Sequence, residues 1–466
     1  MTVQDEHTAV DEVTADELAA FSRTLGRLRA LPADNLVRLH AERQLKSFVS
    51  ENRKRRRQSG KDEARQADAD LLAATATGAR DRREDAPLAG APAAPLGELR
   101  LGRRCYVCKQ RYRQVGTFYH MLCPGCAADN TARRALATDL RGRRALLTGG
   151  RVKIGFQLAL MMLRDGAELI VTSRFPHDTV RRFHAAAGSE QWRDRLTVVG
   201  IDLRDPRQVL GLAEHLRSDG RPLDILVNNA AQTLRRPPES YALLAAGERT
   251  ALPASSATVV HAPGFRPMPA LHTAWPAAEL ATADGPSTPA LLPEQADEAG
   301  LLPDLAPVNS WSSRLGALDP AEVLETQLVN ALAPALLCDR LLPLLLASPH
   351  PRRYIVNVTA VEGRFAVRNK TAGHPHTNMA KAALNMLTRT SAEQLAAQGV
   401  HMCAVDTGWI TDENPAPKKT RLAADGFRTP LDIVDGAARV YDPIVRGEAG
   451  APVSGVFLKD YREAAW

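Results

Sequence analysis

Four cysteines fall into two pairs with the spacing of a metal site. Cys105, Cys108, Cys123 and Cys126 form the pattern Cys-x2-Cys-x14-Cys-x2-Cys. Each pair can form a tight knuckle turn, and two knuckles supply four thiolates for a tetrahedral Zn²⁺. Because four thiolates leave no open coordination position, we expect the zinc to be structural rather than catalytic.

A glycine-rich turn predicts a site for a phosphate-bearing cofactor. Residues 141–176 have the pattern of a strand, a glycine turn, an amphipathic helix and a second strand. Such a turn brings backbone N–H groups and a helix N-terminus to a pyrophosphate. The residues predicted to contact a dinucleotide here are Thr148, Gly149, Gly150, Arg151, Ile154 and Gly155.

The end of the second strand indicates which dinucleotide is bound. The strand ends in Ser173 and Arg174 rather than in an acidic residue. An acid would bind the ribose 2′-hydroxyl of NAD, whereas an arginine accommodates the 2′-phosphate of NADP. The sequence therefore favours NADP over NAD. The alternative is an arginine that is merely exposed at the end of a strand.

Further segments follow in an order that identifies a family. They include Asp202–Leu203, DILVNNAAQ at 224–232, VNALAPALL at 329–337, YIVNVTA at 354–360, MAKAALNMLTRTSAEQL at 379–395 and TGWIT at 407–411. Together they resemble the short-chain dehydrogenase/reductase family over residues 141–232 and 315–466. The resemblance implies a Rossmann-type, doubly wound parallel sheet with helices on both faces. It also implies oxidoreduction of a carbonyl or alcohol.

The resemblance assigns roles residue by residue. Asp202 and Leu203 would flank the adenine. Asn228, Asn229 and Ala230 would border the cofactor. Asn330 would support a proton relay, and Lys381 would bind the nicotinamide ribose and tune the catalytic acid.

Three positions depart from the family pattern. The family's tyrosine, four residues before the lysine, is Thr377 here, and its carbonyl-polarising serine is Ala360, with Thr359 just before it. Lys153 stands where the turn would carry another glycine. Its charge could bind phosphate, or its long side chain could crowd the pyrophosphate. The two alternatives remain open.

A threonine hydroxyl cannot replace the tyrosine, because its pKa lies far above the tyrosine value of about 10. A histidine could, since it titrates near neutrality. We therefore expect His376, or His374, to act as acid and base, with Thr359 or Asn357 donating to the carbonyl. The alternative is that both histidines only belong to a loop or a helix cap.

The elements that position these residues suggest three parts. Residues 1–97 are predicted to be helical and partly disordered, with two helices broken near Pro32 and a linker over 58–97. Residues 98–135 form a zinc ribbon expected to dock on the sheet domain, which spans 141–466. Within that domain, residues 233–310 hold twelve of the chain's 31 prolines. This predicts a mostly flexible insertion that could lie over an active-site mouth.

Composition limits the location and the partners. No apolar run approaches the roughly 18 residues of a membrane span, and the acidic N-terminus differs from a signal peptide. We expect a cytoplasmic protein with a small-molecule substrate, no membrane partner and, by the resemblance, a homo-oligomeric state. The net charge is +7, with a basic knot at Arg53–Arg57. A solvated face is favoured there over nucleic-acid binding.

The sequence thus predicts an NADP-dependent oxidoreductase with an atypical active site. Two alternatives stay open. One is a catalytically silent NADP(H)-binding sensor or scaffold, which the missing serine and tyrosine would explain. The other is an adaptor for nucleic acid or protein that acts through the zinc ribbon.

Overall fold

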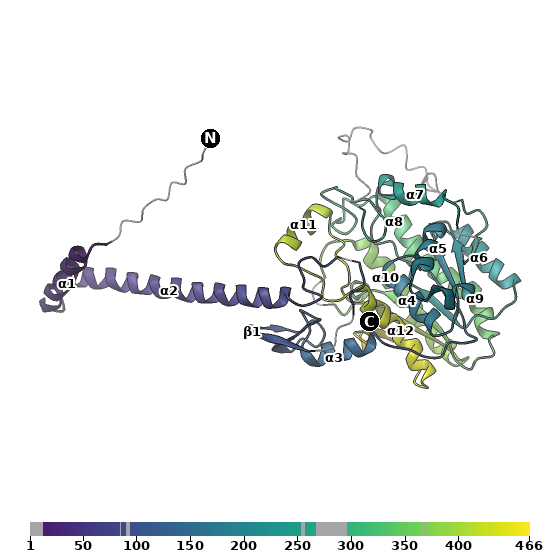
Figure 1. Ribbon diagram of the computed structural model, residues 1–466, viewed down its shortest axis with the longest axis horizontal. Coiled ribbons are helices and arrows are strands. Elements are labelled where there is room, and N and C mark those ends of the chain that lie inside the picture. The colour runs from purple at the N-terminus through teal and green to yellow at the C-terminus, as the bar shows by residue number, and fades with distance from the viewer. Residues whose placement is uncertain (1–12, 84, 90–93, 253–256, 267–295, 368–369) are drawn as a thin grey trace. The chain divides into compact units, whose positions relative to one another are not determined.

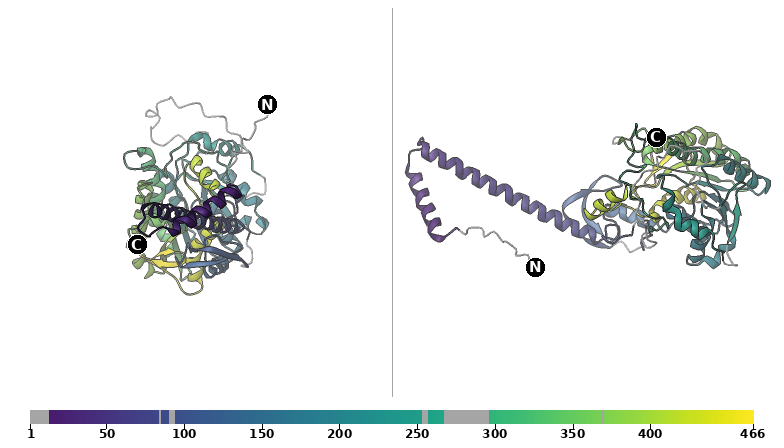
Figure 2. Two further views of the ribbon diagram at one scale, coloured as in Figure 1. Left: turned by 90° about the vertical axis from the view of Figure 1, so that its left-hand side faces the viewer. Right: turned by 90° about the horizontal axis from the view of Figure 1, so that it is seen from above.

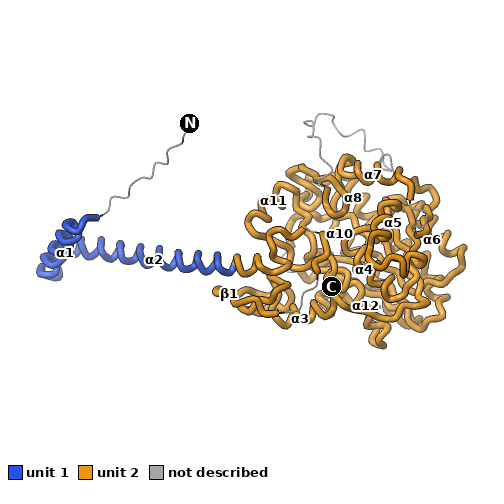
Figure 3. Tube along the Cα trace, viewed as in Figure 1, with its two compact units in different colours: residues 1–68 blue, residues 69–466 orange. Residues whose placement is uncertain are grey.

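The computed structural model describes residues 13–83, 85–89, 94–252, 257–266, 296–367 and 370–466. The chain divides into two compact units, residues 1–68 and residues 69–466 (Figure 3). The cysteine segment and the predicted Rossmann domain therefore lie within one unit.

The first unit contains α1 (Ala15–Ala30) and most of α2 (Leu36–Ala73) among its described residues. α1 begins with a capping box, in which Thr14 and Glu17 exchange side-chain and backbone hydrogen bonds. α2 begins where the side chain of Asn35 accepts hydrogen bonds from backbone N–H groups of the first turn. The predicted break between two helices is confirmed.

The linker predicted for residues 58–97 is wrong over most of its described part. Residues 58–73 continue α2, supported by side-chain hydrogen bonds such as the one from Gln58 to Asp62 (3.0 Å). Further along, within the second unit, the Arg82 guanidinium donates to the carbonyl of Thr429 (2.7 Å), which holds this residue against a distant segment of the same unit. Alanine and paired charges are compatible with helix, so low apolar content alone did not indicate a linker.

A nine-stranded sheet forms the centre of the second unit (Figure 1). Its strand order is β11-β10-β9-β8-β6-β3-β4-β5-β7, with every neighbouring pair parallel except β10 and β11. The strands are β3 (Arg144–Leu147), β4 (Glu168–Ser173), β5 (Leu196–Gly200), β6 (Ile225–Asn228), β7 (Thr258–His261), β8 (Arg353–Thr359), β9 (Val400–Asp406), β10 (Phe457–Lys459) and β11 (Arg462–Ala464). The predicted Rossmann-type parallel sheet is confirmed.

Two hydrophobic cores cover the two faces of this sheet, and Figure 2 shows the covering helices from two further sides. Leu147 belongs to the core with α4, α5 and α12, whereas its neighbour Leu146 belongs to the core with α6, α9 and α10. Alternate side chains of a strand point to opposite faces, so one buried strand serves both cores. The helices are α4 (Lys153–Arg164), α5 (Pro176–Ala185), α6 (Pro206–Ser218), α7 (Ala242–Glu248), α8 (Pro320–Gln327), α9 (Ala333–Leu346), α10 (Pro375–Ala396), α11 (Ala416–Ala424) and α12 (Ile433–Glu448).

One helical stretch is longer and more apolar than the sequence analysis predicted. The stretch Pro320–Leu346, formed by α8, a π-helical turn (Leu328–Leu332) and α9, is long and apolar enough to cross a membrane by composition. The sequence-based statement that no apolar segment approaches this length is therefore wrong. Half of its most apolar window is buried inside the fold, where α9 packs with α6 in one core. These apolar side chains belong to that core.

Within the insertion at 233–310, the described residues are more ordered than predicted. They include a 3₁₀ turn (Pro238–Tyr241), α7 and β7, and β7 pairs in parallel with β5 at the edge of the sheet. Tyr241 and Leu244 pack with Phe175 in a small cluster. The β-branched run in β7 decided the local structure despite the surrounding prolines. Residues 253–256 and 267–295 lie outside the described residues.

We call residues 95–133 the four-cysteine module. It consists of the hairpin β1 (Pro95–Arg104) and β2 (Arg111–Gly116) followed by α3 (Pro124–Arg133). Its aromatic side chains share a hydrophobic cluster with Ile410, Leu431 and Ile433, and the hydroxyl of Tyr119 donates to Asp435 of α12 (2.6 Å). The predicted docking of this segment on the sheet domain is confirmed.

Candidate cofactor and active site

The glycine turn and the segment after β6 form one hydrogen-bonded unit. The Thr148 hydroxyl accepts from the backbone N–H groups of Asn229 and Ala230 (both 3.0 Å), and Asn229 Nδ2 donates to the carbonyl of Thr148 (3.0 Å). Gly149 has φ +71, and a Cβ there would lie 2.9 Å from Ala230 Cα. A Cβ at Gly155 would lie 2.1 Å from the Gly149 carbonyl oxygen. Both positions therefore require glycine.

This unit lies at the topological switch point of the sheet. From β3 the chain proceeds to β4 and β5 on one side, then returns to β6 on the other side of β3. In open parallel sheets the crevice outside the carboxyl ends of the strands at such a point is where ligands bind. The structure thus places the predicted cofactor turn at the expected edge.

Lys153 pairs with carboxylates of the chain, which neither of the two alternatives for this residue predicted. It adopts φ +54, the left-handed region that a glycine at this position would tolerate freely. Its Nζ pairs with Asp85 Oδ2 (3.0 Å) and lies 3.7 Å from Glu413 Oε1. Burial works against the charged amine, yet the carboxylates of Glu413 and Asp85 hold the pKa of Lys153 above its ordinary value. The charge of Lys153 is therefore already paired inside the chain.

Arg151 is also held by the protein itself. It is buried, and its Nη1 donates to Asp178 Oδ2 and to the carbonyl of Ala299 (both 2.7 Å). Its predicted contact with cofactor would require these bonds to be exchanged. Ser173 is buried as well, and its hydroxyl accepts from the backbone N–H of Phe175 (3.0 Å).

Arg174 differs from these two residues. Its guanidinium lies over the rings of Tyr241 (5.1 Å to the ring centre) and Phe175 (5.7 Å). Among the described residues we find no hydrogen bond or ion pair to it. Nearby, Asp202 pairs with Arg204 (2.6 Å), and Leu203 is buried in the core below. The arginine that the sequence selected for the 2′-phosphate thus has no hydrogen-bond or ion-pair partner among the described residues.

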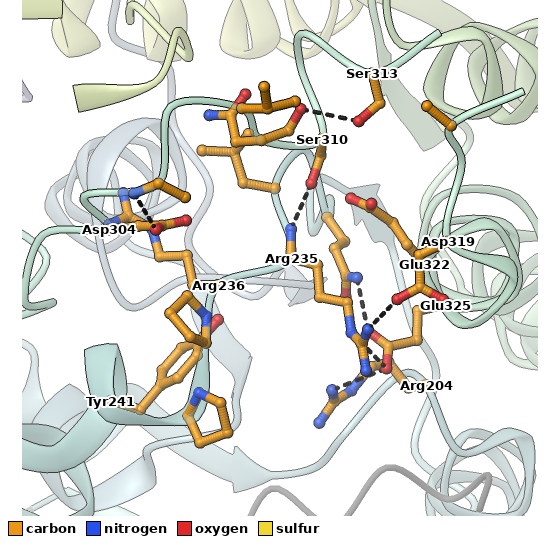
Figure 4. A pocket seen from close by; sticks show the side chains of 18 of the residues that line it. Arg204, Arg235, Arg236, Tyr241, Asp304, Ser310, Ser313, Asp319, Glu322 and Glu325 are labelled. Atoms are coloured by element: carbon orange, nitrogen blue, oxygen red, sulfur yellow. Dashed lines mark hydrogen bonds and ion pairs between the residues drawn. The ribbon is translucent and has the colours of Figure 1, made fainter. Parts of the chain in front are cut away.

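Arg174 lines a cavity of about 460 Å³ at the carboxyl edge of the sheet. Figure 4 shows Arg204, Arg235 and Glu325 gathered on one side of this cavity and Arg236 with Tyr241 on the other. Arg204 Nη1 and Arg235 Nε each lie 3.6 Å from Glu325 Oε1. Described residues of the insertion therefore build part of the wall, as expected of a segment near a site mouth.

The predicted catalytic lysine is buried. Lys381 Nζ donates to the carbonyl of Val358 (2.8 Å), and burial lowers the pKa of this amine to about 8. Thr377 lies one turn earlier on the same face of α10, and its buried hydroxyl has no hydrogen-bond partner among the described residues. With threonine in place of the family's tyrosine, the hydroxyl one turn before Lys381 therefore has no hydrogen-bond partner among the described residues.

Asn330 fixes the backbone beyond the cofactor turn. It lies in the π-helical turn between α8 and α9. Its Oδ1 accepts from the backbone N–H of Gln232 (2.7 Å), and its Nδ2 donates to the carbonyl of the same residue (2.9 Å). Asn330 therefore holds the residue that follows the Asn-Asn-Ala-Ala segment, which is compatible with its predicted supporting role.

Of the two candidate carbonyl donors, Asn357 is unsuitable. It is fully buried in β8, where its Oδ1 accepts from Asn228 (2.8 Å) and its Nδ2 donates to Thr388 (2.9 Å). The hypothesis that Asn357 donates to a substrate is wrong, because both amide atoms are already bonded within the core. Thr359 makes only a long bond, from its hydroxyl to the carbonyl of Lys381 (3.4 Å).

The two histidines have different surroundings. His374 begins α10 with φ +42, stacks on the ring of Trp311 (3.8 Å between ring centres), and hydrogen-bonds through Nδ1 to the Trp311 carbonyl (3.0 Å). Burial lowers the pKa of His374. These contacts place His374 at the start of α10, in agreement with the alternative that it belongs to a helix cap.

The ring of His376 is buried and has no hydrogen-bond partner among the described residues. The residue is 1% exposed. Its Nε2 lies 3.7 Å from Oε1 of Glu322, a residue that also lines the cavity. Although burial opposes ionisation, the neighbouring His376 ring and the Ser310 hydroxyl hold the pKa of Glu322 below its ordinary value. The structure thus pairs His376 with a carboxylate that the sequence did not single out.

The four cysteines converge as predicted. Their Sγ atoms all lie within 4.8 Å of one another, and the Cys108 and Cys123 sulfurs are 3.7 Å apart. Tetrahedral coordination with Zn–S bonds of about 2.3 Å would place two sulfurs about 3.8 Å apart. Cys123 caps α3 and Cys126 lies in its first turn, so the second pair sits on a helix start. The residues present fit a tetrathiolate metal site.

Comparison with known proteins gives matches over the same segments. A family model described as short chain dehydrogenase matches residues 143–246, and one described as Enoyl-(Acyl carrier protein) reductase matches residues 300–427. An uncharacterized protein of Acanthamoeba polyphaga mimivirus is 29% identical over 360 residues, which cover 73% of this chain and 71% of the viral protein. The C-signal protein of Myxococcus xanthus is 32% identical over 122 residues, covering 26% of this chain and 72% of that protein.

Two more relatives complete the comparison. Gluconate 5-dehydrogenase of Gluconobacter oxydans is 32% identical over 103 residues, 22% of this chain and 39% of the enzyme. A solved structure of a short chain dehydrogenase from Burkholderia cenocepacia in complex with NADP is 21% identical, with a TM-score of 0.44, and covers 69% of this chain and 97% of its own. With the parallel sheet, the glycine turn and the two family matches in agreement, the chain belongs to the short-chain dehydrogenase/reductase family.

Proposed function

We propose that the protein is an NADP-dependent oxidoreductase that acts on a carbonyl or alcohol group of a small molecule. The observation that carries the proposal is the Arg174 guanidinium, which faces a 460 Å³ cavity without a hydrogen-bond or ion-pair partner among the described residues. An arginine at the end of the second strand is the residue type that accommodates a 2′-phosphate. Membership of a family of oxidoreductases supports the reaction type.

The chain's own residues suggest how the site would work. When bound, NADPH supplies the hydride. Lys381 would bind the nicotinamide ribose, as the family resemblance implies, and Thr359 would donate to the substrate carbonyl. His376 would hold the proton at its ring and pass it to the substrate oxygen, with the Glu322 carboxylate 3.7 Å from its Nε2. Asn330 would keep the backbone at Gln232 in place.

Arg174→Ala tests the cofactor assignment. We expect the Kd for NADPH to rise about tenfold to hundredfold, because charge-assisted hydrogen bonds to the 2′-phosphate are lost. The Kd for NADH should stay within twofold of wild type. Isothermal titration with both nucleotides measures this, and Arg207→Ala is a matched control, since Arg207 pairs with Asp205 on the surface. An equal loss of affinity for both nucleotides would contradict the proposed role.

A second candidate function is an NADP(H) sensor without turnover. Thr377 and Ala360 favour it, because neither side chain supplies the proton chemistry of the family's tyrosine and serine. Binding of NADPH with no hydride transfer to a broad panel of carbonyl compounds would select this candidate over the oxidoreductase. No binding of either nucleotide would exclude both candidates.

We also propose that the four cysteines bind one structural zinc ion. The observations that support it are the converging Sγ atoms and the docking of the module on the sheet domain. The zinc would hold the two knuckles together and would not contact substrate.

Metal analysis of the purified protein tests this. We expect one zinc per chain in the wild type and less than about a tenth of that in Cys108→Ser, since removal of one thiolate opens the closed tetrahedral shell. Proteolysis should then become faster within residues 98–135. Cys338→Ala, which alters a core thiol outside the module, should retain one zinc per chain. A zinc content near zero in wild-type protein purified without chelators would refute the assignment.

A nucleic-acid adaptor role has weaker support. The basic residues Arg53–Arg57 are exposed on α2, where they could contact phosphates. Binding to DNA or RNA that does not weaken with salt, or no binding, would count against this role, because phosphate contacts release counterions.

A further inference from the structure

Tyr106, the residue after Cys105, contacts a loop that comes much later in the chain. The hydroxyl of Tyr106 accepts a hydrogen bond from the backbone N–H of Trp409 (2.9 Å). The same hydroxyl would be 3.5 Å from a Cβ at Gly408, whose φ is +81. Tyr106 thus holds a turn whose backbone geometry depends on glycine.

The loop that it contacts, residues 407–413, follows β9 at the carboxyl edge of the sheet. Ile410 is buried in the hydrophobic cluster of the four-cysteine module, together with Ile154 from the first turn of α4. The module is therefore packed directly behind the glycine turn proposed to hold the cofactor.

The far end of the loop reaches the proposed site. Glu413 Oε1 lies 3.7 Å from Lys153 Nζ in that turn, and the Glu413 carbonyl accepts from Asn309 Nδ2 (2.9 Å). Asn309 lines the 460 Å³ cavity. One loop of seven residues thus joins the cysteine module to the glycine turn and to the cavity wall.

We propose that Tyr106 is a positioning residue, which fixes the loop 407–413 against the cofactor site from within the four-cysteine module. The proposal rests on the proposed binding of NADPH. It gives the module a role in the site although none of its cysteines contacts the cavity.

Other contacts allow the hydroxyl to be removed without undocking the module. Tyr119 donates to Asp435 (2.6 Å), and Arg134, the residue directly after the module, pairs with Asp432 (2.5 Å). Both are independent of Tyr106, and the phenylalanine ring of Tyr106→Phe keeps the ring packing. The variant therefore removes one acceptor and leaves the module attached.

The test compares Tyr106→Phe with Tyr112→Phe and wild type. Tyr112 is a matched control, because its hydroxyl donates to the His120 carbonyl inside the module (3.1 Å) and does not contact the loop. In Tyr106→Phe we expect amide hydrogen exchange in residues 407–413 and the Kd for NADPH each to rise about fivefold, the effect of one net neutral hydrogen bond. Zinc content and Tm should match those of wild type. A purely structural defect would instead lower them. Tyr112→Phe should change neither loop exchange nor NADPH affinity.

Two results would overturn the proposal. Loop exchange in Tyr106→Phe that equals wild type would show that the hydroxyl does not fix the loop. Faster exchange with an unchanged Kd for NADPH would show that the loop's position does not matter to the site. Failure of the proposed function is distinguishable, because wild-type protein itself would then not bind NADPH.

Discussion

Replacing Lys381 with methionine is expected to lower turnover by about 10²-fold or more and, at neutral pH, to raise the stability of the fold. The amine is buried and its one hydrogen bond among the described residues goes to the Val358 carbonyl. A buried cation with a single neutral acceptor costs free energy of folding, whereas methionine fills similar space without charge. The buried amine is therefore expected to destabilise the fold, whatever its role in the proposed function.

The pKa of Lys381 determines how the stability of the fold should change with pH. Burial lowers the pKa of Lys381 to about 8 in the folded chain, whereas an unfolded lysine titrates near 10.4. Between these values the unfolded chain binds more protons, so the free energy of unfolding of wild type rises with pH there. The destabilisation is complete below about pH 8 and is lost as pH approaches 10.4. Lys381→Met lacks this rise.

Urea unfolding at pH 7 and pH 9.5 measures the effect. The difference in free energy of unfolding between Lys381→Met and wild type should shrink from the first pH to the second. Lys418→Met is the matched control, because Lys418 is exposed on α11. A difference that is the same at both pH values would rule out a strained, buried amine.

Replacing His376 with alanine is expected to slow hydride transfer by about 10²- to 10⁴-fold, the usual contribution of a positioned acid or base. The Kd for NADPH should stay within twofold. The reason is that His376 is 1% exposed, lies beside Glu322, and has no hydrogen-bond partner among the described residues to satisfy its ring. We propose that the substrate supplies the missing partner of this ring.

A panel of carbonyl compounds, followed by NADPH absorbance, identifies a substrate and then compares variants. Glu322→Gln should give a smaller loss than His376→Ala, since it removes the charge beside the ring but keeps the ring. His215→Ala, on the exposed face of α6, is the control and should not change the rate. Unchanged turnover in His376→Ala would remove this histidine from the mechanism.

The fold and the cofactor turn could be predicted because their signals are local. The buried run that contains Leu146 and Leu147, and the glycines at 149 and 155, carry strand and turn information within a few residues. The two cysteine pairs are local in the same sense, and their convergence follows from two knuckle turns. The proposed substrate, cytoplasmic location and homo-oligomeric state stay predictions.

The partners of the site residues could not be predicted, because they come from distant segments. Lys153 pairs with Asp85, which lies in a stretch interpreted as a linker, and with Glu413 from the loop after β9. His376 lies beside Glu322 of a different helix. A sequence pattern reports which face of an element is buried, but it does not report which distant charge will lie against that face.

The edge strand β7 affects the tendency of the protein to aggregate. Without it, β5 would be the outermost strand of the sheet and would present its unpaired N–H and C=O groups to solvent. Open edges of this kind template pairing with other chains and lead to aggregation. The proline-rich insertion supplies the strand that covers that edge. Trimming residues 233–310 as a dispensable loop would therefore sacrifice solubility along with part of the cavity wall.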